Sequence, residues 1–216
     1  MVGVCMTAGG LHMPPTFGAE PRLGTNPIAI AAPAKNEAPV LFDAATSAIA
    51  GNKVRLAERV GANLLPGWVS DAGGTPIMEE TPVRESGDYY ILPLGGTREQ
   101  GSHKGYGFAA VAEILSQIMS GTGPAFMNAG SMSFWFCAYK IEAFTEVAKF
   151  KTDMDEFLNA LATTPPAPGH DRVLYAGLSE HEETQLREKE GIPYHHEVID
   201  WFRSLSDARN LGIDLG

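Results

Sequence analysis

Short apolar runs separated by glycine- and proline-rich segments recur along the chain. Runs of this length, bounded in this way, are typical of buried β-strands. We predict strands at residues 1–6, 40–42, 89–93, 131–138 and 172–175, with a further apolar run at 28–32. The strand at 40–42 has Asp43 at its carboxyl end, and residues 64–74 are predicted to form a turn-rich loop.

Apolar residues at helical spacing predict amphipathic helices between these strands. The clearest helix covers residues 103–119. Its predicted buried face consists of Phe108, Val111, Ala112, Leu115, Ile118 and Met119. Glu113 and Gln117 are expected to face away from the core. Further helices are predicted from a cap at Thr46 or Ser47 to about residue 60, at 143–162, from a cap at Ser179 to about 190, and at 196–211. Because strands and helices alternate, the predicted class is α/β.

Charge and length exclude several classes of protein. The 26 acidic residues outnumber the 16 basic ones, so the formal net charge is −10 and the surface should repel nucleic-acid phosphates. No basic patch, signal peptide or apolar run of about 18 residues is visible. Cys5 and Cys137 lie in apolar segments, which is typical of reduced thiols. We therefore expect a cytoplasmic protein with no nucleic-acid or membrane partner.

The sequence at residues 105–110 matches G-x-G-x-x-A and opens a predicted helix. This is the form of a dinucleotide phosphate loop, in which glycines let the backbone approach the pyrophosphate. A Rossmann fingerprint also needs a strand just before it and an acidic residue about 20 positions later. Residues 122–130 contain no acid. A tight turn leading into a helix is therefore the favoured interpretation.

Three residues leave alternatives open. Lys104 precedes that helix, where a lysine is usually disfavoured, so it either helps bind an anion or is simply solvated. Asp43 could hold a ribose hydroxyl or cap the following helix, and capping is favoured. Trp68 is either a core aromatic or a pocket wall.

Metal-binding and nucleophilic chemistry are not predicted. His195 and His196, with His181, raise the possibility of a metal site. However, adjacent histidines point to different sides, and no cysteine or carboxylate completes a ligand set at the usual spacing. Cys5 and Cys137 are expected to be inert because they lie in apolar strands. The sequence contains no G-x-S-x-G motif.

Several motifs occur in an order that resembles a known family. They are G-T-N-P-I-A at 24–29, F-D-A-A-T-S at 42–47, G-N-K at 51–53, L-P-G-W at 65–68, D-A-G-G-T-P at 71–76, L-P-L-G-G at 92–96, H-K-G-Y-G at 103–107, P-A-P-G at 166–169 and E-G-I-P at 190–193. Together they resemble the type 2 malate/L-lactate dehydrogenases, a family that includes ureidoglycolate and sulfolactate dehydrogenases and Δ1-piperideine-2-carboxylate reductases. The resemblance covers nearly the whole chain.

The resemblance implies an NAD- or NADP-dependent interconversion of 2-hydroxy and 2-oxo acids by a homodimer. It also implies a non-Rossmann mixed sheet with flanking helices, as a single family region over 1–216. The cofactor-binding core would cover about 1–140, followed by a helical and strand part at about 141–216. The positions that match the family's cofactor-binding segments are Asp43, Ala44, Ala45, Lys104, Gly177, Leu178 and Ser179. The match of the last three is looser, whereas the match of Lys104 favours the anion-binding interpretation.

The chain also departs from the family pattern. Family members carry an amino-terminal portion with a histidine that donates and accepts the proton and an arginine that grips the substrate carboxylate. This chain is expected to begin after that portion, so none of its residues is assigned a catalytic role. His12 and His103 are the nearest candidates for a substitute acid, and Ser133 falls near where many members have a histidine. The alternative function is a catalytically incomplete nucleotide-binding fragment, or a subunit that needs a separate amino-terminal partner.

Overall fold

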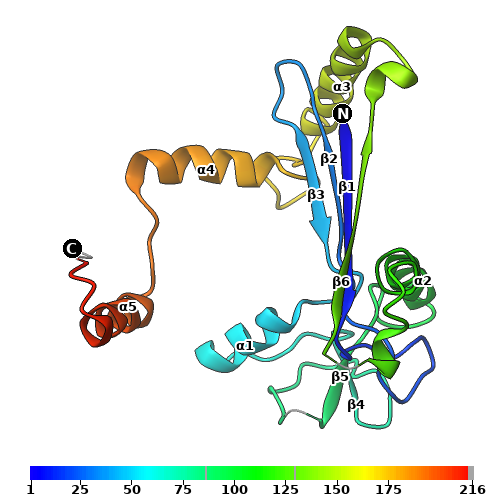
Figure 1. The fold of residues 1–216 in the computed structure, drawn as a ribbon, viewed down its shortest axis with the longest axis vertical. Coiled ribbons are helices and arrows are strands. Elements are labelled where there is room, and N and C mark those ends of the chain that lie inside the picture. The colour runs from blue at the N-terminus through cyan, green and yellow to red at the C-terminus, as the bar shows by residue number, and fades with distance from the viewer. Residues whose placement is uncertain (86, 129, 214–216) are drawn as a thin grey trace. The chain divides into compact units, whose positions relative to one another are not determined.

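The computed structural model describes residues 1–85, 87–128 and 130–213, which form two compact units at 1–177 and 178–216. The first unit contains a four-stranded sheet in the order β3-β2-β1-β6 and a two-stranded sheet, β4-β5 (Figure 1). The strands are β1 (Val2–Gly9), β2 (Ile28–Ala32), β3 (Val40–Ala44), β4 (Val69–Asp71), β5 (Tyr89–Ile91) and β6 (Met132–Tyr139). Every pairing between these strands is antiparallel.

The chain combines these strands with helices, which confirms the predicted α/β class in its coarse form. The α-helices are α1 (Gly51–Val60), α2 (Ser102–Glu113), α3 (Val147–Ala162), α4 (Leu178–Glu190) and α5 (His196–Arg209). The predicted alternation is wrong, because β1, β2 and β3 precede the first helix, and α3, α4 and α5 end the chain. A π-helical turn, η1 (Ile114–Ile118), continues α2, and short 3₁₀ turns form η2 (Ala125–Met127) and η3 (Ile141–Ala143). In the part of the chain that the structure describes, none of the helices combines the length and the apolar character that crossing a bilayer requires.

The strand predictions were wrong in two places. Residues 69–71, placed in a loop, form β4, which pairs with β5. Residues 172–175 do not form a strand. Next to this segment, Leu41 N of β3 donates a backbone hydrogen bond to Ala176 O at 3.0 Å. The Tyr175 hydroxyl also donates to Ala38 O, just before β3. Isolated bonds of this kind do not make the repeating ladder of a sheet.

The register of the large sheet assigns its residues to faces. Directly opposed residues of antiparallel strands share a face. Asp43, Ala29, Cys5 and Phe136 therefore form one row across β3, β2, β1 and β6. Cys137 follows Phe136 in β6, so its side chain points to the other face. Both cysteines are free, in agreement with the expected reduced thiols.

The orientation predicted for the helix at 103–119 was wrong. Glu113 and Gln117, expected to be exposed, are buried, and Gln117 has no exposed surface. Phe108 and Met119, expected in the core, are 53% and 65% exposed. The residues that this helix buries are small or polar: Ser102, Gly105, Ala109, Ala112, Glu113, Ser116 and Gln117.

Hydrogen bonds to the sheet explain this orientation. The Gln117 amide nitrogen donates to Ala8 O and to Ser131 O, both at 3.3 Å, and its oxygen accepts from the Ser133 hydroxyl at 2.9 Å. The Ser116 hydroxyl donates to Met6 O at 3.2 Å. A buried amide needs such partners, and here they fasten η1 to β1 and to the start of β6.

The apolar core is divided between two clusters. One is built by Ile49, Val54, Ala57, Leu64, Val69 and Ile91, with Trp68 packed against it. The Lys53 ammonium lies 4.7 Å from the centre of the Trp68 ring, a cation–π contact. Trp68 is thus a partly buried residue at the border of the core. The second cluster is smaller and contains Met13, Leu23 and Ala109, which join the 11–23 loop to α2.

The turn between β2 and β3 is fastened to α3 by a single carboxylate. Asp155 accepts hydrogen bonds from the backbone nitrogens of Lys35 at 2.8 Å and Asn36 at 3.0 Å, and from the Asn36 side chain at 2.8 Å. Figure 1 shows α3 beside this turn. Burial raises the pKa of Asp155, but the hydrogen bonds from Asn36, Lys35 and Glu37 outweigh it and hold the pKa below its usual value.

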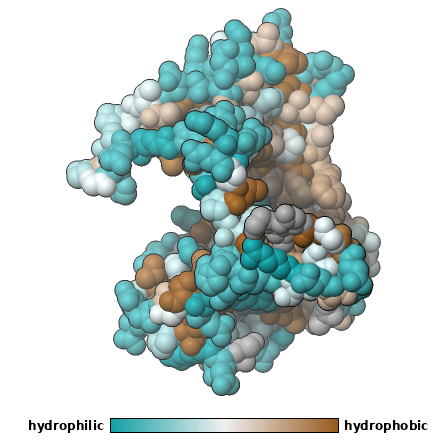
Figure 2. All heavy atoms as spheres, turned by 90° about the vertical axis from the view of Figure 1, so that its left-hand side faces the viewer, coloured by the Kyte–Doolittle hydropathy of each residue, from teal (hydrophilic) through white to brown (hydrophobic). Residues whose placement is uncertain are grey.

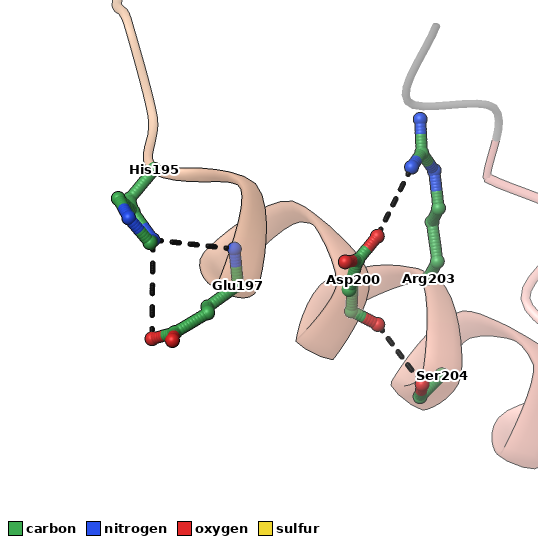
Figure 3. A network of polar contacts seen from close by, with 5 residues as sticks. All are labelled: His195, Glu197, Asp200, Arg203 and Ser204. Carbon is green, nitrogen blue, oxygen red and sulfur yellow. Dashed lines mark hydrogen bonds and ion pairs between the residues drawn. The ribbon is translucent and has the colours of Figure 1, made fainter.

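The second unit consists of α4 and α5. α4 begins at Leu178, so Ser179 lies inside the helix and does not precede it as a cap. His195 is the N-cap of α5, and its Nδ1 accepts a hydrogen bond from Glu197 N at 3.4 Å (Figure 3). Farther along α5, Arg203 pairs with Asp200 at 3.2 Å.

Candidate functional site

The F-D-A-A-T-S motif does not begin a helix. α1 starts seven residues after Ala44, and its N-cap, Ala50, makes no side-chain capping bond. The predicted caps at Thr46 or Ser47, and the favoured capping role of Asp43, were therefore wrong. Asp43 is an exposed residue of β3, and its carboxylate forms no hydrogen bond or ion pair with the described residues. Its carboxylate is available to a ligand.

The residues after Asp43 are pinned to the G-T-N-P motif. The Thr46 hydroxyl donates to Thr25 O at 3.0 Å and Asn26 O at 3.2 Å, and Thr46 N also donates to Thr25 O. Asn26 is buried, with a positive φ of 32° that asparagine tolerates better than most residues. The Asn26 amide donates to Ala109 O and to the Glu113 carboxylate, both at 3.0 Å. These bonds connect the end of β3 to α2.

Residues 92–94 provide a second connection to α2. Leu94 N donates to Thr46 O at 2.9 Å, and Ala48 N donates to Leu92 O at 2.7 Å. A Cβ on Gly105 would lie only 2.4 Å from Leu94 O, so α2 can approach this backbone only with glycine at that position. A Cβ added to Gly107 would have no atom within 4 Å. This packing explains the first glycine of G-x-G-x-x-A without a phosphate. The motif lies inside α2, which begins at Ser102, so the prediction that it forms the tight turn leading into the helix was wrong.

Lys104 lies exposed in the first turn of α2. That turn contains no acidic residue, and its N-cap, Gly101, has no side chain to satisfy the free backbone N–H groups. Within the described ranges Lys104 takes part in no ion pair. Nearby, Arg98 Nη1 lies 3.0 Å from His103 Nδ1. An uncompensated lysine at the positive end of a helix suits an anionic ligand.

Gly177 lies against Leu41 of β3, and Leu41 precedes Asp43 by two residues in that strand. The φ of Gly177 is 96°, and a Cβ there would come within 2.7 Å of Leu41 N. Leu178 and Ser179, the other two positions of the late loop, begin the second unit. The structure therefore joins Asp43, Ala44 and Ala45 to Gly177 on one side and, through Leu94, to the helix of Lys104 on the other.

The sequence analysis missed the buried polar residue that organises this region. Glu113 accepts from Asn26 at 3.0 Å and from Ala125 N at 2.7 Å, so it joins G-T-N-P, α2 and η2. A usable signal was present. Gly105, Ala109, Ala112 and Ser116 recur at helical spacing, and such small residues mark a face that packs closely against backbone.

The two histidines considered as substitute acids have other contacts. The His103 Nδ1 lies 3.0 Å from Arg98 Nη1, so the ring is engaged with that guanidinium. His12 lines a pocket of about 680 Å³ between α1 and β5, together with Tyr89. Burial raises the Tyr89 pKa, and the nearby Glu58 carboxylate raises it further. Ser133 is committed to Gln117.

The histidine pair has a carboxylate neighbour that the sequence analysis overlooked. One ligand atom from each of His195, His196 and Glu197 lies within 4.8 Å of the others, and all three residues are exposed. The Nδ1 of His195 already accepts the capping bond of α5 (Figure 3). His181 lies on α4, where its Nε2 contacts Gln185 at 2.9 Å.

Comparison with known proteins places this geometry in a family context. A malate dehydrogenase from Pyrococcus abyssi is 34% identical over 99% of this chain and 59% of its own length. Hydroxycarboxylate dehydrogenase B from Escherichia coli K12 is 32% identical over 99% of this chain and 56% of its own length. The chain thus spans somewhat over half the length of these relatives.

The fold is shared with a solved structure. Malate dehydrogenase from Entamoeba histolytica superimposes with a TM-score of 0.90 at 32% identity, covering 99% of this chain and 63% of that one. A family model described as malate/L-lactate dehydrogenase matches residues 1–203. The chain therefore belongs to the malate/L-lactate dehydrogenase family.

Proposed function

We propose that this chain acts in an NAD- or NADP-dependent oxidoreductase that interconverts a 2-hydroxy acid and a 2-oxo acid by hydride transfer. The observation that carries the proposal is the bonded connection of Asp43–Thr46 with the helix of Lys104. The unpaired carboxylate and the unpaired ammonium on these two segments match the polar and anionic groups of a nicotinamide dinucleotide. Family membership supports the reaction class.

The proposed roles follow from the chemistry of each group. The Lys104 ammonium attracts an anionic part of the cofactor, since its charge is not neutralised by any described carboxylate. Asp43 accepts hydrogen bonds from a ribose hydroxyl, and Ala44 and Ala45 let the cofactor approach the backbone. Gly177 lets the late segment pack directly against β3, where a Cβ would lie 2.7 Å from Leu41 N, and Leu178 and Ser179 begin α4 next to it in the sequence. The bound nicotinamide supplies the hydride acceptor.

We assign the proton of the 2-hydroxyl to neither of the two histidines considered as substitute acids. His103 is engaged with Arg98, and His12 lies beside α1 and β5. By family resemblance, this proton belongs to a histidine of the amino-terminal portion of relatives. The second candidate function is therefore a nucleotide-binding chain that is catalytically incomplete alone, or a subunit completed by a separate partner.

A homodimer in the cytoplasm is the proposed assembly. The outer side of α2–η1 exposes Phe108, Val111, Ile114, Ile118 and Met119. Apolar surface also interrupts the polar surface on the face drawn in Figure 2. Contiguous apolar surface on a protein of this kind marks a contact with another chain. The net charge of −10 argues against nucleic acid as that contact.

Cofactor binding is tested by titrating the chain into NADH and NADPH while following nicotinamide fluorescence. We expect fluorescence to rise and Lys104→Ala to weaken binding at least tenfold, which is about 1.4 kcal/mol. Lys149→Ala is the matched control, because Lys149 is equally cationic but pairs with Asp153 on α3. Equal titrations for the two variants would remove Lys104 from the cofactor site. Turnover of pyruvate or oxaloacetate by the chain alone would exclude the incomplete-fragment candidate.

A further inference from the structure

Two imidazoles and a carboxylate meet at the first turn of α5. The rings of His195 and His196 lie side by side, with their centroids 4.1 Å apart and their planes tilted by 36°. The expectation that adjacent histidines point to different sides was therefore wrong. One ligand atom from each ring and one from the Glu197 carboxylate all lie within 4.8 Å of one another. The three side chains thus present nitrogen and oxygen ligands to one small region.

His195 and Glu197 have the spacing of a chelating pair. The Nδ1 of His195 lies 3.8 Å from Glu197 Oε2, and Figure 3 shows the ring and the carboxylate turned towards each other. Zinc bonds to nitrogen and oxygen are about 2.0–2.2 Å long, so two ligand atoms of one ion lie at most about 4.3 Å apart. The competing hydrogen bond, from Glu197 N to the same Nδ1, is 3.4 Å long and therefore weak. A metal ion can replace it at little cost.

The third ligand, His196, is exposed and able to adjust. The side chains of His195 and Glu197 are 54% and 60% exposed, and small rotations of the three side chains close the remaining separation. Among the described residues, His196 makes no hydrogen bond or ion pair that would hold it back. Asp200, the next carboxylate along α5, pairs with Arg203 (Figure 3). Water is left to fill the other coordination positions.

Charge and ligand type decide which ion suits this turn. The N-terminal end of a helix carries partial positive charge, which opposes a cation. Glu197 is the acidic residue of this turn and offsets that charge, and the net charge of −10 attracts cations to the protein. Imidazole nitrogen is a ligand of zinc, nickel and copper, whereas magnesium and calcium take oxygen ligands.

We propose that His195, His196 and Glu197 bind a divalent transition-metal cation of the zinc class, which fixes the first turn of α5. All three ligands come from one chain, so each copy holds one ion. The ion depends on Glu197 for its charge balance and on both imidazoles for its selectivity. None of these residues takes part in the proposed hydride transfer, so the site is independent of the proposed function.

The test is isothermal titration of the full chain with Zn²⁺ and, separately, with Mg²⁺. We expect one zinc ion per chain and no measurable binding of magnesium. Loss of a group that only orients a ligand costs about 10–100-fold in metal affinity. His196→Ala and Glu197→Gln remove ligands, so each should weaken zinc binding at least tenfold.

Two further variants separate ligation from structure. His195→Asn removes the imidazole but keeps a residue that is favoured as an N-cap, so it should weaken zinc at least tenfold without lowering the melting temperature of the zinc-free chain. His170→Ala is the matched control, because His170 is an exposed histidine outside the cluster, and zinc binding should not change.

Four results would overturn the proposal. Zinc does not bind, magnesium binds as tightly as zinc, or His170→Ala weakens zinc as much as His196→Ala does. The fourth is binding of half a zinc ion per chain, because the ion would then bridge two copies and the site would not be complete in one. NADH titration of Glu197→Gln should match that of the parent chain, which keeps this test separate from the test of the cofactor site.

Discussion

Helices α1 and α2 bury opposite kinds of residue. α1 buries Val54 and Ala57 in the larger core cluster and turns its charged residues outward. α2 and η1 bury small and polar residues, and large apolar side chains such as Phe108 and Ile114 remain exposed. The comparison teaches that α1 packs on this chain through apolar side chains, although Leu56 and Val60 of the same helix remain exposed. α2 instead forms its internal contacts through hydrogen bonds and close backbone packing, and its apolar side chains are left exposed.

The largest expected effect tests the close packing of α2. Gly105→Ala places a Cβ 2.4 Å from Leu94 O, so the helix or the 92–94 segment must shift. We expect a loss of about 3 kcal/mol in the free energy of unfolding, the upper range for overpacking. Gly107→Ala has open space and is the control; it should stabilise by about 0.5–1 kcal/mol, as glycine-to-alanine changes inside helices do. Chemical denaturation measures both. Equal effects at the two positions would contradict the packing argument.

Next in size is the buried carboxylate of α2. Glu113→Leu leaves the Asn26 amide and Ala125 N without their acceptor. Each buried unsatisfied group costs about 1–3 kcal/mol, and we expect a total loss of about 2–3 kcal/mol in unfolding free energy. Glu58→Leu makes the same change on the exposed side of α1 and should alter stability far less. A comparable loss from Glu58→Leu would mean that the two helices do not differ as described.

In α1, the ordinary apolar packing predicts a moderate effect. Val54 is 4% exposed within the larger cluster, so Val54→Ala deletes two methyl groups from a packed core. We expect about 1–2 kcal/mol of destabilisation, between the usual costs of Ile→Val and Leu→Ala. Thermal or chemical unfolding gives the value. No loss would show that α1 is not held by this cluster.

On the outer side of α2 the expected stability change is small. Phe108→Ser and Ile118→Ser should each alter the unfolding free energy of the isolated chain by no more than about 0.5 kcal/mol, because both side chains are exposed. Sedimentation provides the sharper readout, since these changes should weaken self-association if this side meets a second copy. Unchanged association would move the dimer contact elsewhere.

The smallest expected effect is the loss, in acid, of the stability that Asp155 contributes. The pKa of Asp155 is lowered in the folded chain, so its hydrogen bonds to the 35–37 turn stabilise the fold fully above its unfolded pKa of about 3.9. That contribution is lost as the pH falls through the lower folded pKa. The melting temperature of Asp155→Asn should therefore be below that of the parent at pH 6, and the difference should shrink towards pH 2.5. A difference that does not vary with pH would contradict this assignment.

The strands were predictable because each is a short apolar run between turn residues. β4 escaped because only three residues, Val69–Asp71, form it inside a loop-like sequence. The buried face of α2 was predicted wrongly for a different reason. Apolar spacing reports that a helix has two sides, but Gln117 and Glu113 take partners from Ala8 and Asn26, more than 80 residues away. The small residues at helical spacing mark the face that packs closely, and they do not say which polar groups it meets.

The motifs propose the residues of the candidate site, and they do not give its arrangement. Family resemblance selects Asp43 and Lys104, but their connection depends on Leu94, which belongs to neither motif. The sequence also could not show that the Asp43 carboxylate is free. Asp43 ends an apolar run before a predicted helix, as a capping residue would, but α1 begins only at Gly51. Arg98, beside His103, belongs to none of the motifs on which the family resemblance rests.

The two cysteines offer a practical use of the sheet. Cys5 shares its row with Asp43, whereas Cys137 points to the side on which η1 is fastened. A thiol reagent of defined size, applied to single-cysteine variants, would therefore report separately on each side. Shielding of Cys5 alone by a dinucleotide would map that molecule to the Asp43 side, and shielding of Cys137 alone would map it to the other.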